Sequence, residues 1–194
     1  MKKRTIVITV IAVLLLAIIV FTCYGIIKKY GIEKELTEKY TITEEQWNAA
    51  INYENYSVST VNPYGKEDVY KFTKEGYCSY SKTYGETKYV FIGEQCYELV
   101  KAGDGWVAQY SALADDHKMF SSYVDYWNEL VYNEETNSYV YADGWDTVEF
   151  QFEYGVLVRY KITMFFGDSE TTAEYFVFDV GQTHVDFPEY RIAE

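Results

Sequence analysis

The hydrophobic pattern divides the chain into one unbroken apolar run and a longer part in which apolar and polar residues alternate. The run covers residues 5–27 and is flanked by the basic residues Lys2–Arg4 on one side and by Lys28 and Lys29 on the other. As a helix it would extend roughly 34 Å, which is enough to cross a hydrocarbon core of about 30 Å. The pattern therefore predicts a single membrane-spanning helix.

A cleaved signal peptide and a lipoprotein signal are the alternatives for this run. A cleaved signal has a shorter apolar stretch, about 7–15 residues, with small residues before the cleavage site. Residues 20–24 read Val-Phe-Thr-Cys-Tyr, and Phe21 stands where a small residue precedes a lipid-modified cysteine. An uncleaved anchor is thus favoured over cleavage and over lipidation of Cys23.

The basic residues on the two sides of the run nearly balance, so orientation depends on the short N-terminal tail. A very short basic tail ahead of a first span usually stays inside. We therefore expect a single-pass protein of the cell membrane whose C-terminal part is extracytoplasmic. The chain then divides into an anchor at 1–29, a tether or helical extension at 30–42 and an extracytoplasmic domain at 43–194.

Two stretches beyond the anchor have helical spacing. Thr43 and Gln46 form the capping-box pattern, and the apolar residues after them predict a short helix ending near Tyr53. From 111 to 130, apolar residues recur close to i, i+3, i+4 and i+7, which predicts a long amphipathic helix with Ser111 as its N-cap. We expect this helix to lie across a sheet.

The rest of the domain alternates with a period of two, and turn residues recur every 8–12 residues. This pattern is typical of an antiparallel meander with one face toward water. In the strand at 156–166 the even-numbered residues are expected to face the core, as are Phe176, Phe178 and Val180 in the next strand. The fold class is α+β, with a curved, half-barrel-like antiparallel sheet. The predicted strands are 56–61, 69–73, 77–82, 87–92, 96–100, 106–110, 138–141, 147–153, 156–166 and 171–180, with a last segment at 184–187.

Composition limits the partners of this domain. Five of the 17 basic residues lie in the first 29 positions, so the remainder carries 12 basic and 30 acidic residues, a net charge of −18 against −13 for the whole chain. Such a surface repels phosphate backbones and anionic headgroups, which argues against nucleic acid as a partner. The 22 tyrosines and 11 phenylalanines suit pleated strands.

Cys78 and Cys96 are the cysteines outside the apolar run. An exported pair suggests a disulfide. In a meander, however, both would lie opposite the neighbourhood of Phe91 and be two strands apart, about 10 Å, whereas a disulfide needs Cα atoms within about 7 Å. We expect buried thiols, unless the strand order is not sequential.

The sequence contains no motif that names a reaction, a cofactor or a metal. Phosphate-binding loops, nucleophile elbows and paired-cysteine motifs are absent. Asp115, Asp116 and His117 are consecutive, so on a helix they do not converge on one metal ion. Acidic turns at 134–135 and 143–146 could hold calcium, but they lack the spacing of an EF-hand. We expect no enzyme activity, no cofactor and no metal site.

Aromatic side chains are the remaining candidates for a binding site. They could line an apolar cavity between the sheet and the amphipathic helix, which is how many small-molecule sites look. The alternative is that they fill the core. The candidate lining residues are Tyr70, Phe72, Tyr80, Tyr89, Phe91, Tyr97, Trp106, Phe120, Trp127 and Phe150.

The order of elements resembles the half-barrel of the LolA/LppX-like lipoprotein carriers. The resemblance rests on residues 55–58 (Asn-Tyr-Ser-Val), Gly105-Trp106, the turn at 155–157 and the tail at 181–188, over most of residues 43–188. It implies a concave side that holds an acyl chain or another lipid. We therefore expect a non-catalytic domain, anchored in the membrane through residues 5–27, that binds a lipid or protein partner. The alternative is a structural or protein-interaction module with a filled core.

Overall fold

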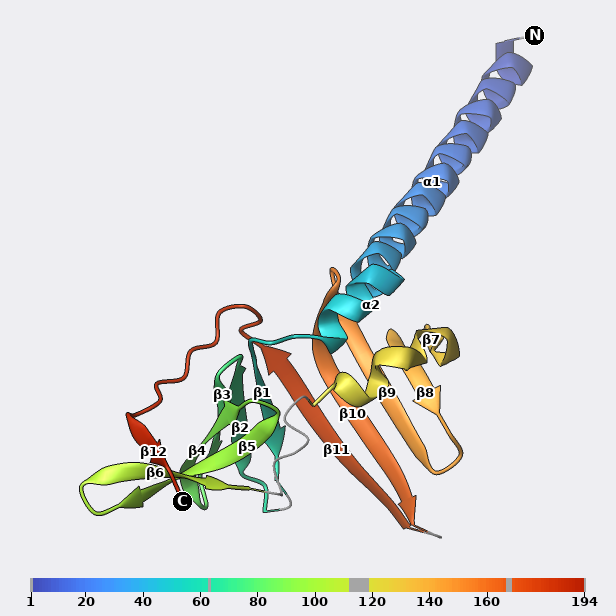
Figure 1. The fold of residues 1–194 in the computed structure, drawn as a ribbon. Coiled ribbons are helices and arrows are strands. Elements are labelled where there is room, and N and C mark those ends of the chain that lie inside the picture. Colours follow the sequence, from blue (N-terminus) through green and yellow to red (C-terminus); the bar gives the residue numbers. More distant parts are fainter. Residues whose placement is uncertain (1, 63, 112–118, 167–168, 194) are drawn as a thin grey trace.

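One long helix projects from one end of a curved, open sheet (Figure 1). The computed structural model describes residues 2–62, 64–111, 119–166 and 169–193, and only the backbone of residues 2–17, 121 and 166. The long helix, α1 (Lys2–Tyr40), is continuous, so the predicted tether is helical almost to its end. Its side chains from residue 18 to 38 are exposed, and Figure 1 shows that most of the helix stands clear of the domain.

The predicted membrane span lies within α1, but the side chains of residues 5–17 are outside the described residues. In the part of the chain whose side chains are described, no helix has a stretch that is both long and apolar enough to cross a bilayer.

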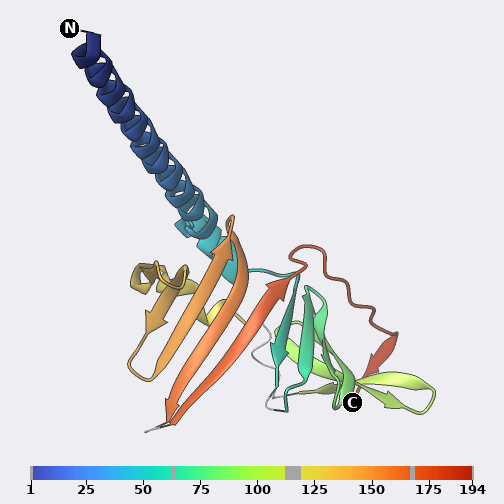
Figure 2. The ribbon, with the colours of Figure 1, turned by 180° about the vertical axis from the view of Figure 1, so that it is seen from behind.

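The sheet has 12 strands in the order β12-β6-β5-β4-β3-β2-β1-β11-β10-β9-β8-β7. Neighbours pair antiparallel, except that β12 runs parallel to β6. The α+β class and the curved antiparallel sheet are thus confirmed, and Figure 2 shows that the sheet stays open. The strands are β1 (Tyr56–Val61), β2 (Glu67–Thr73), β3 (Gly76–Ser81), β4 (Gly85–Ile92), β5 (Gln95–Ala102), β6 (Gly105–Tyr110), β7 (Val131–Asn133), β8 (Ser138–Ala142), β9 (Asp146–Glu153), β10 (Val156–Phe166), β11 (Ser169–Phe178) and β12 (Tyr190–Ile192).

The short helix α2 (Glu44–Ile51) begins at the predicted capping box. The Thr43 hydroxyl accepts from the Gln46 N–H at 3.3 Å, and the Gln46 side chain accepts from the Thr43 N–H at 2.9 Å. Just before this helix, the Lys39 ammonium pairs with Glu153 at 3.0 Å, and the Lys39 carbonyl accepts from the Tyr154 N–H at 2.7 Å. These bonds attach the end of α1 to the β9–β10 turn.

The prediction of a long amphipathic helix at 111–130 is wrong for residues 119–130, which the structure describes. Residues 112–118 lie outside the described residues, and the next element is a 3₁₀ helix, η2 (Ser121–Glu129). Ser111 caps no described helix, since η2 begins only at Ser121 with Phe120 at its N-cap. The Ser111 N–H donates to the Cys96 carbonyl at 3.0 Å. Serine, valine, aspartate, asparagine and aromatics are weak helix formers. The 3₁₀ geometry aligns positions i and i+3, which places Tyr123 and Tyr126 edge to face at 5.7 Å.

Side chains are buried on both faces of the sheet. Tyr89 and Val90 are neighbours in β4 and therefore point to opposite faces. Tyr89 belongs to the face that α2 and η2 cover, which we call the helix side, whereas Val90 lies on the other side. The main cluster, on the helix side, is centred on Trp47, Phe120, Phe150, Phe152 and Leu157. The second cluster, on the opposite side, consists of Val90, Leu99 and Ala108 with Ile92, Tyr97, Trp106 and Phe187 packed against it.

The C-terminal segment, residues 179–190, covers the second cluster. Asn55 holds this segment by two side-chain bonds, donating to the Thr183 carbonyl at 2.8 Å and accepting from the Thr183 N–H at 2.7 Å. The Ser57 and Thr183 hydroxyls lie 2.8 Å apart. Residues 55–58 and 181–188, which the sequence singles out separately, are therefore in contact. The predicted strand at 184–187 is wrong, because this stretch crosses the sheet and pairs only beyond Pro188 as β12.

Two predicted strand faces need correction. A β-bulge between Leu157 and Arg159 inserts one residue into β10, so Leu157 is buried beside Tyr160 while Val156 is 41% exposed. In β11, Val177 is buried opposite Val58, whereas Phe176 and Phe178 are 47% and 38% exposed. At residues 175–178 both faces of this strand are apolar in sequence, so alternation alone did not choose between them.

Candidate functional site

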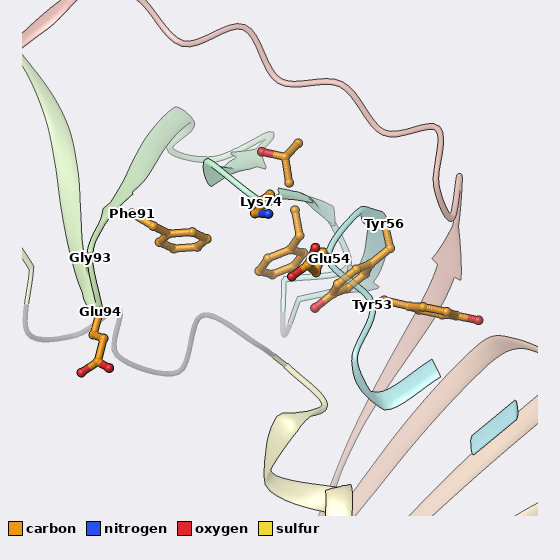
Figure 3. Close-up of a pocket in the computed structure, with 9 residues that line it drawn as sticks. Tyr53, Glu54, Tyr56, Lys74, Phe91, Gly93 and Glu94 are labelled. Carbon is orange, nitrogen blue, oxygen red and sulfur yellow. The ribbon is translucent and has the colours of Figure 1, made fainter. Parts of the chain in front are cut away.

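A cavity of about 400 Å³ opens at the end of the sheet from which α1 leaves. The antiparallel strand order places four connections at one end of the sheet: the start of β1, the β2–β3 turn, the β4–β5 turn and the β9–β10 turn. The cavity is built from the first three of these, and α1 is attached to the fourth. Its lining residues are Tyr53, Glu54, Tyr56, Phe72, Thr73, Lys74, Phe91, Gly93 and Glu94 (Figure 3).

Two stacked aromatic rings, those of Tyr56 and Phe72, form the floor of the cavity, and the stack continues outside it through Tyr77 and Tyr89. Tyr56 on β1 stacks on Phe72 on β2, with ring centroids 4.7 Å apart, and Phe72 stacks on Tyr77 at 5.3 Å. Tyr77 in turn stacks on Tyr89 at 4.5 Å. Residues directly opposite one another on neighbouring strands bring their side chains together, so one aromatic residue per strand produces this ladder. Phe91, on β4, faces Tyr56 across the cavity (Figure 3).

Tyr53 and Tyr56, whose side chains contribute to the cavity wall, have neutral hydroxyls that bond to backbone groups. Burial raises the pKa of Tyr56, although a hydrogen bond to the Met119 backbone acts in the opposite direction. Burial also raises the pKa of Tyr53, whose hydroxyl accepts from the Leu157 N–H at 3.4 Å. Phenols held in the protonated form add no charge to the wall of the cavity.

Charged side chains form the rim. Glu54 comes from the link between α2 and β1, Lys74 from the β2–β3 turn and Glu94 from the β4–β5 turn, and all three are exposed. An apolar floor with a few polar groups at the mouth is the usual composition of a small-molecule site. The arrangement suits a ligand with an apolar body and a polar end.

The structure brings only part of the predicted aromatic set to this cavity. Phe72 and Phe91 line it. Tyr70 and Tyr89 lie on the same face outside it. The other predicted residues are elsewhere: Phe120, Trp127 and Phe150 are in or against the main cluster, and Tyr97 and Trp106 pack on the second cluster. Tyr80 lines a separate pocket on the face away from the helices.

Sequence reasoning missed the residues that the turns contribute. Tyr53, Glu54, Lys74 and Glu94 are far apart in sequence and meet because three connections end at the same edge. Their only sequence signal is their position beside predicted turns, which becomes informative once the strand order is known.

The pocket around Tyr80, about 280 Å³, is also lined by Cys78. The Cys78 thiol donates to Glu86 at 3.3 Å. Burial, together with this carboxylate, raises the pKa of Cys78 to about 12. A thiol that stays protonated at neutral pH is a poor nucleophile, so Cys78 is a structural residue. Cys78 and Cys96 are both buried and lie on β3 and β5 with β4 between them, as the predicted meander requires.

The acidic groups do not form a metal centre in the described residues. No group of three or more histidine, cysteine, aspartate or glutamate side chains converges there. Asp143 instead accepts from the N–H groups of Trp145 and Asp146, each at 2.8 Å, which lowers its pKa. Asp115, Asp116 and His117 lie outside the described residues.

Comparison with known proteins adds no relative: the chain matches no family model and no curated sequence. The resemblance to the LolA/LppX-like carriers therefore stays a prediction.

Proposed function

We propose that the chain is a non-catalytic binding module held at the outer side of a cell membrane, and that its cavity takes up the apolar part of a small amphiphile such as a lipid. The observation that carries the proposal is the stacked aromatic floor beneath a charged rim. At about 400 Å³ the cavity is near the lower end of the range for small-molecule sites, about 300–1,000 Å³. It suits a ring or a short length of acyl chain.

The proposed anchor is the apolar run at residues 5–27. It is supported by the length of the run, by its basic flanks and by its place within one continuous helix. Residues 28–40 would extend that helix for roughly 20 Å beyond the bilayer. Because α1 is attached at the end of the sheet where the cavity opens, an inserted anchor would turn the cavity toward the membrane.

A fluorescent fatty acid tests the ligand proposal on the full chain in non-ionic detergent. We expect saturable uptake, weakened at least about tenfold by Phe91→Glu, because a carboxylate in an apolar cavity opposes an apolar ligand. Phe165→Glu is the matched control, since Phe165 is an exposed residue of β10. Absence of uptake by the wild type, or unchanged uptake by the folded Phe91→Glu variant, would contradict the proposal.

Protease accessibility tests the location separately. Protease added to intact cells should remove residues 43–194 and leave the anchor. Protection in intact cells with digestion after permeabilisation would place the domain inside and reject the extracytoplasmic assignment, whatever the ligand result.

A protein-interaction module is the second candidate function. The observation that favours it is the acidic sheet edge at β7, which has no described strand on its outer side and lies away from the cavity.

A further inference from the structure

The sheet ends at β7, a strand of three residues that pairs only with β8 among the described strands. Val131 at its start is 68% exposed. An edge strand presents unpaired backbone N–H and C=O groups, which another extended chain can use to add a strand. β7 therefore offers a short template for backbone pairing.

A groove of about 590 Å³ runs beside this edge. Val131, Tyr132 and Val140 supply its apolar part, and Glu129, Glu134 and Glu135 supply its charge. The three glutamates are exposed, and none forms an ion pair with a described residue. The groove thus combines a backbone edge with uncompensated negative charge.

The surrounding sequence makes this charge one-sided. Residues 119–158 contain no lysine or arginine and eight acidic residues, namely Asp125, Glu129, Glu134, Glu135, Asp143, Asp146, Glu149 and Glu153. Among the described residues, three cations that pair with this stretch or lie just after it in sequence already have acidic partners: Lys39 pairs with Glu153, Lys161 with Glu149, and Arg159 with Glu174. Lys118, directly before the stretch, lies outside the described residues. Nothing within the described domain neutralises the groove.

We propose that β7 binds an extended segment of another protein that carries lysine or arginine at alternate positions. Alternate side chains of an added strand point to one face, so a period-two basic segment places all its charges toward the glutamates. A second copy of this chain is disfavoured, because pairing β7 with β7 would bring two acidic grooves together. The proposal does not depend on the cavity or its ligand.

Three synthetic peptides test the proposal on the full chain in non-ionic detergent. One alternates lysine and threonine over seven residues, one replaces the lysines with glutamate, and one replaces the threonines with proline. The lysine–threonine peptide should bind, with affinity that falls as salt is raised, and should slow amide exchange at residues 131–133. The glutamate peptide should not bind. The proline peptide should bind at least about tenfold more weakly, because it keeps the charge and cannot add a regular strand.

Charge reversal locates the site. The double substitution Glu134→Lys with Glu135→Lys should weaken binding of the lysine–threonine peptide at least about tenfold. Asp104→Lys with Glu170→Lys changes the net charge equally at exposed residues of other turns and strands, and should leave binding within about twofold. Equal binding of the proline peptide, equal losses in the two protein variants, or no binding by the wild type would each overturn the proposal.

Discussion

The main cluster and the second cluster differ in what covers them. Helices cover the main cluster: α2 places Trp47 against Phe150 at 4.9 Å between ring centroids, and η2 adds Trp127 at 6.4 Å from Trp47. A single irregular segment covers the second cluster, held by the bonds between Asn55 and Thr183 and by Phe187. Many rings packed from several elements make a cover that depends on burial, whereas one crossing segment depends on a few hydrogen bonds. The two sides should therefore respond differently to the same kind of change.

Alkaline pH should have the largest effect, and it acts on the helix side. Burial raises the pKa of Tyr56, Tyr77, Tyr123, Tyr160 and Tyr175 above the ordinary value of 10.0. Above pH 10 the unfolded chain has released these protons while the folded chain still holds them, so stability is intact below pH 10 and falls as pH rises further. We expect cooperative unfolding at alkaline pH.

Tyrosinate absorbance and circular dichroism, followed together, check this expectation. Tyr160→Phe should move the transition to higher pH, because it removes a buried hydroxyl that the unfolded chain would ionise. Ionisation of all tyrosines near pH 10 without loss of structure would contradict the buried hydroxyl network between Tyr123 and Tyr160, whose oxygens lie 2.7 Å apart.

Trp47→Ala should be the most damaging single substitution, costing about 3–5 kcal/mol of unfolding free energy. Trp47 is fully buried at the centre of the helix cover. Its indole N–H has no hydrogen-bond partner among the described residues, so Trp47→Phe removes an unpaired donor and should cost clearly less than Trp47→Ala. Chemical denaturation of both variants measures the difference, and equal losses would argue against ring packing as the source of stability.

Leu99→Ala should cost about 2–3 kcal/mol, less than Trp47→Ala, because fewer side chains pack over the second cluster. Ile32→Ala, at an exposed position of α1, is the control that should leave stability unchanged. Denaturation midpoints check the order. A larger loss at Leu99 than at Trp47 would reverse the comparison between the two clusters.

Asn55→Ala should have the smallest effect on stability, about 1–2 kcal/mol, and the most local one. It removes both side-chain bonds to Thr183, so amide exchange should quicken at residues 183–190 and stay unchanged in the main cluster. Asn52→Ala removes one exposed bond, to the Asn48 carbonyl, and serves as the control. Faster amide exchange throughout the sheet would show that the C-terminal segment stabilises the whole sheet, which would contradict a local effect.

Short-range features of the fold were predictable from the sequence, whereas features that depend on pairing between distant strands were not. The capping box at Thr43, the hairpins and the meander around the cysteines depend on short-range patterns, and each was predictable. The extra residue in β10 and the outward direction of Phe176 depend on pairing between distant strands, so alternation did not specify them. The cavity shows the same limit, because Phe72 and Phe91 lie in regular strands while Glu54 and Lys74 enter through connections.

Native mass spectrometry of the full chain, purified from its own membrane in mild detergent, tests the central claim most directly. We expect a fraction of wild-type molecules to retain a small amphiphile, that fraction to fall sharply in the Phe91→Glu variant, and the Phe165→Glu variant to resemble the wild type. A wild-type spectrum without bound mass that also stays unchanged when fatty acid is added, or equal retention by all three proteins, would contradict a ligand site at the aromatic cavity.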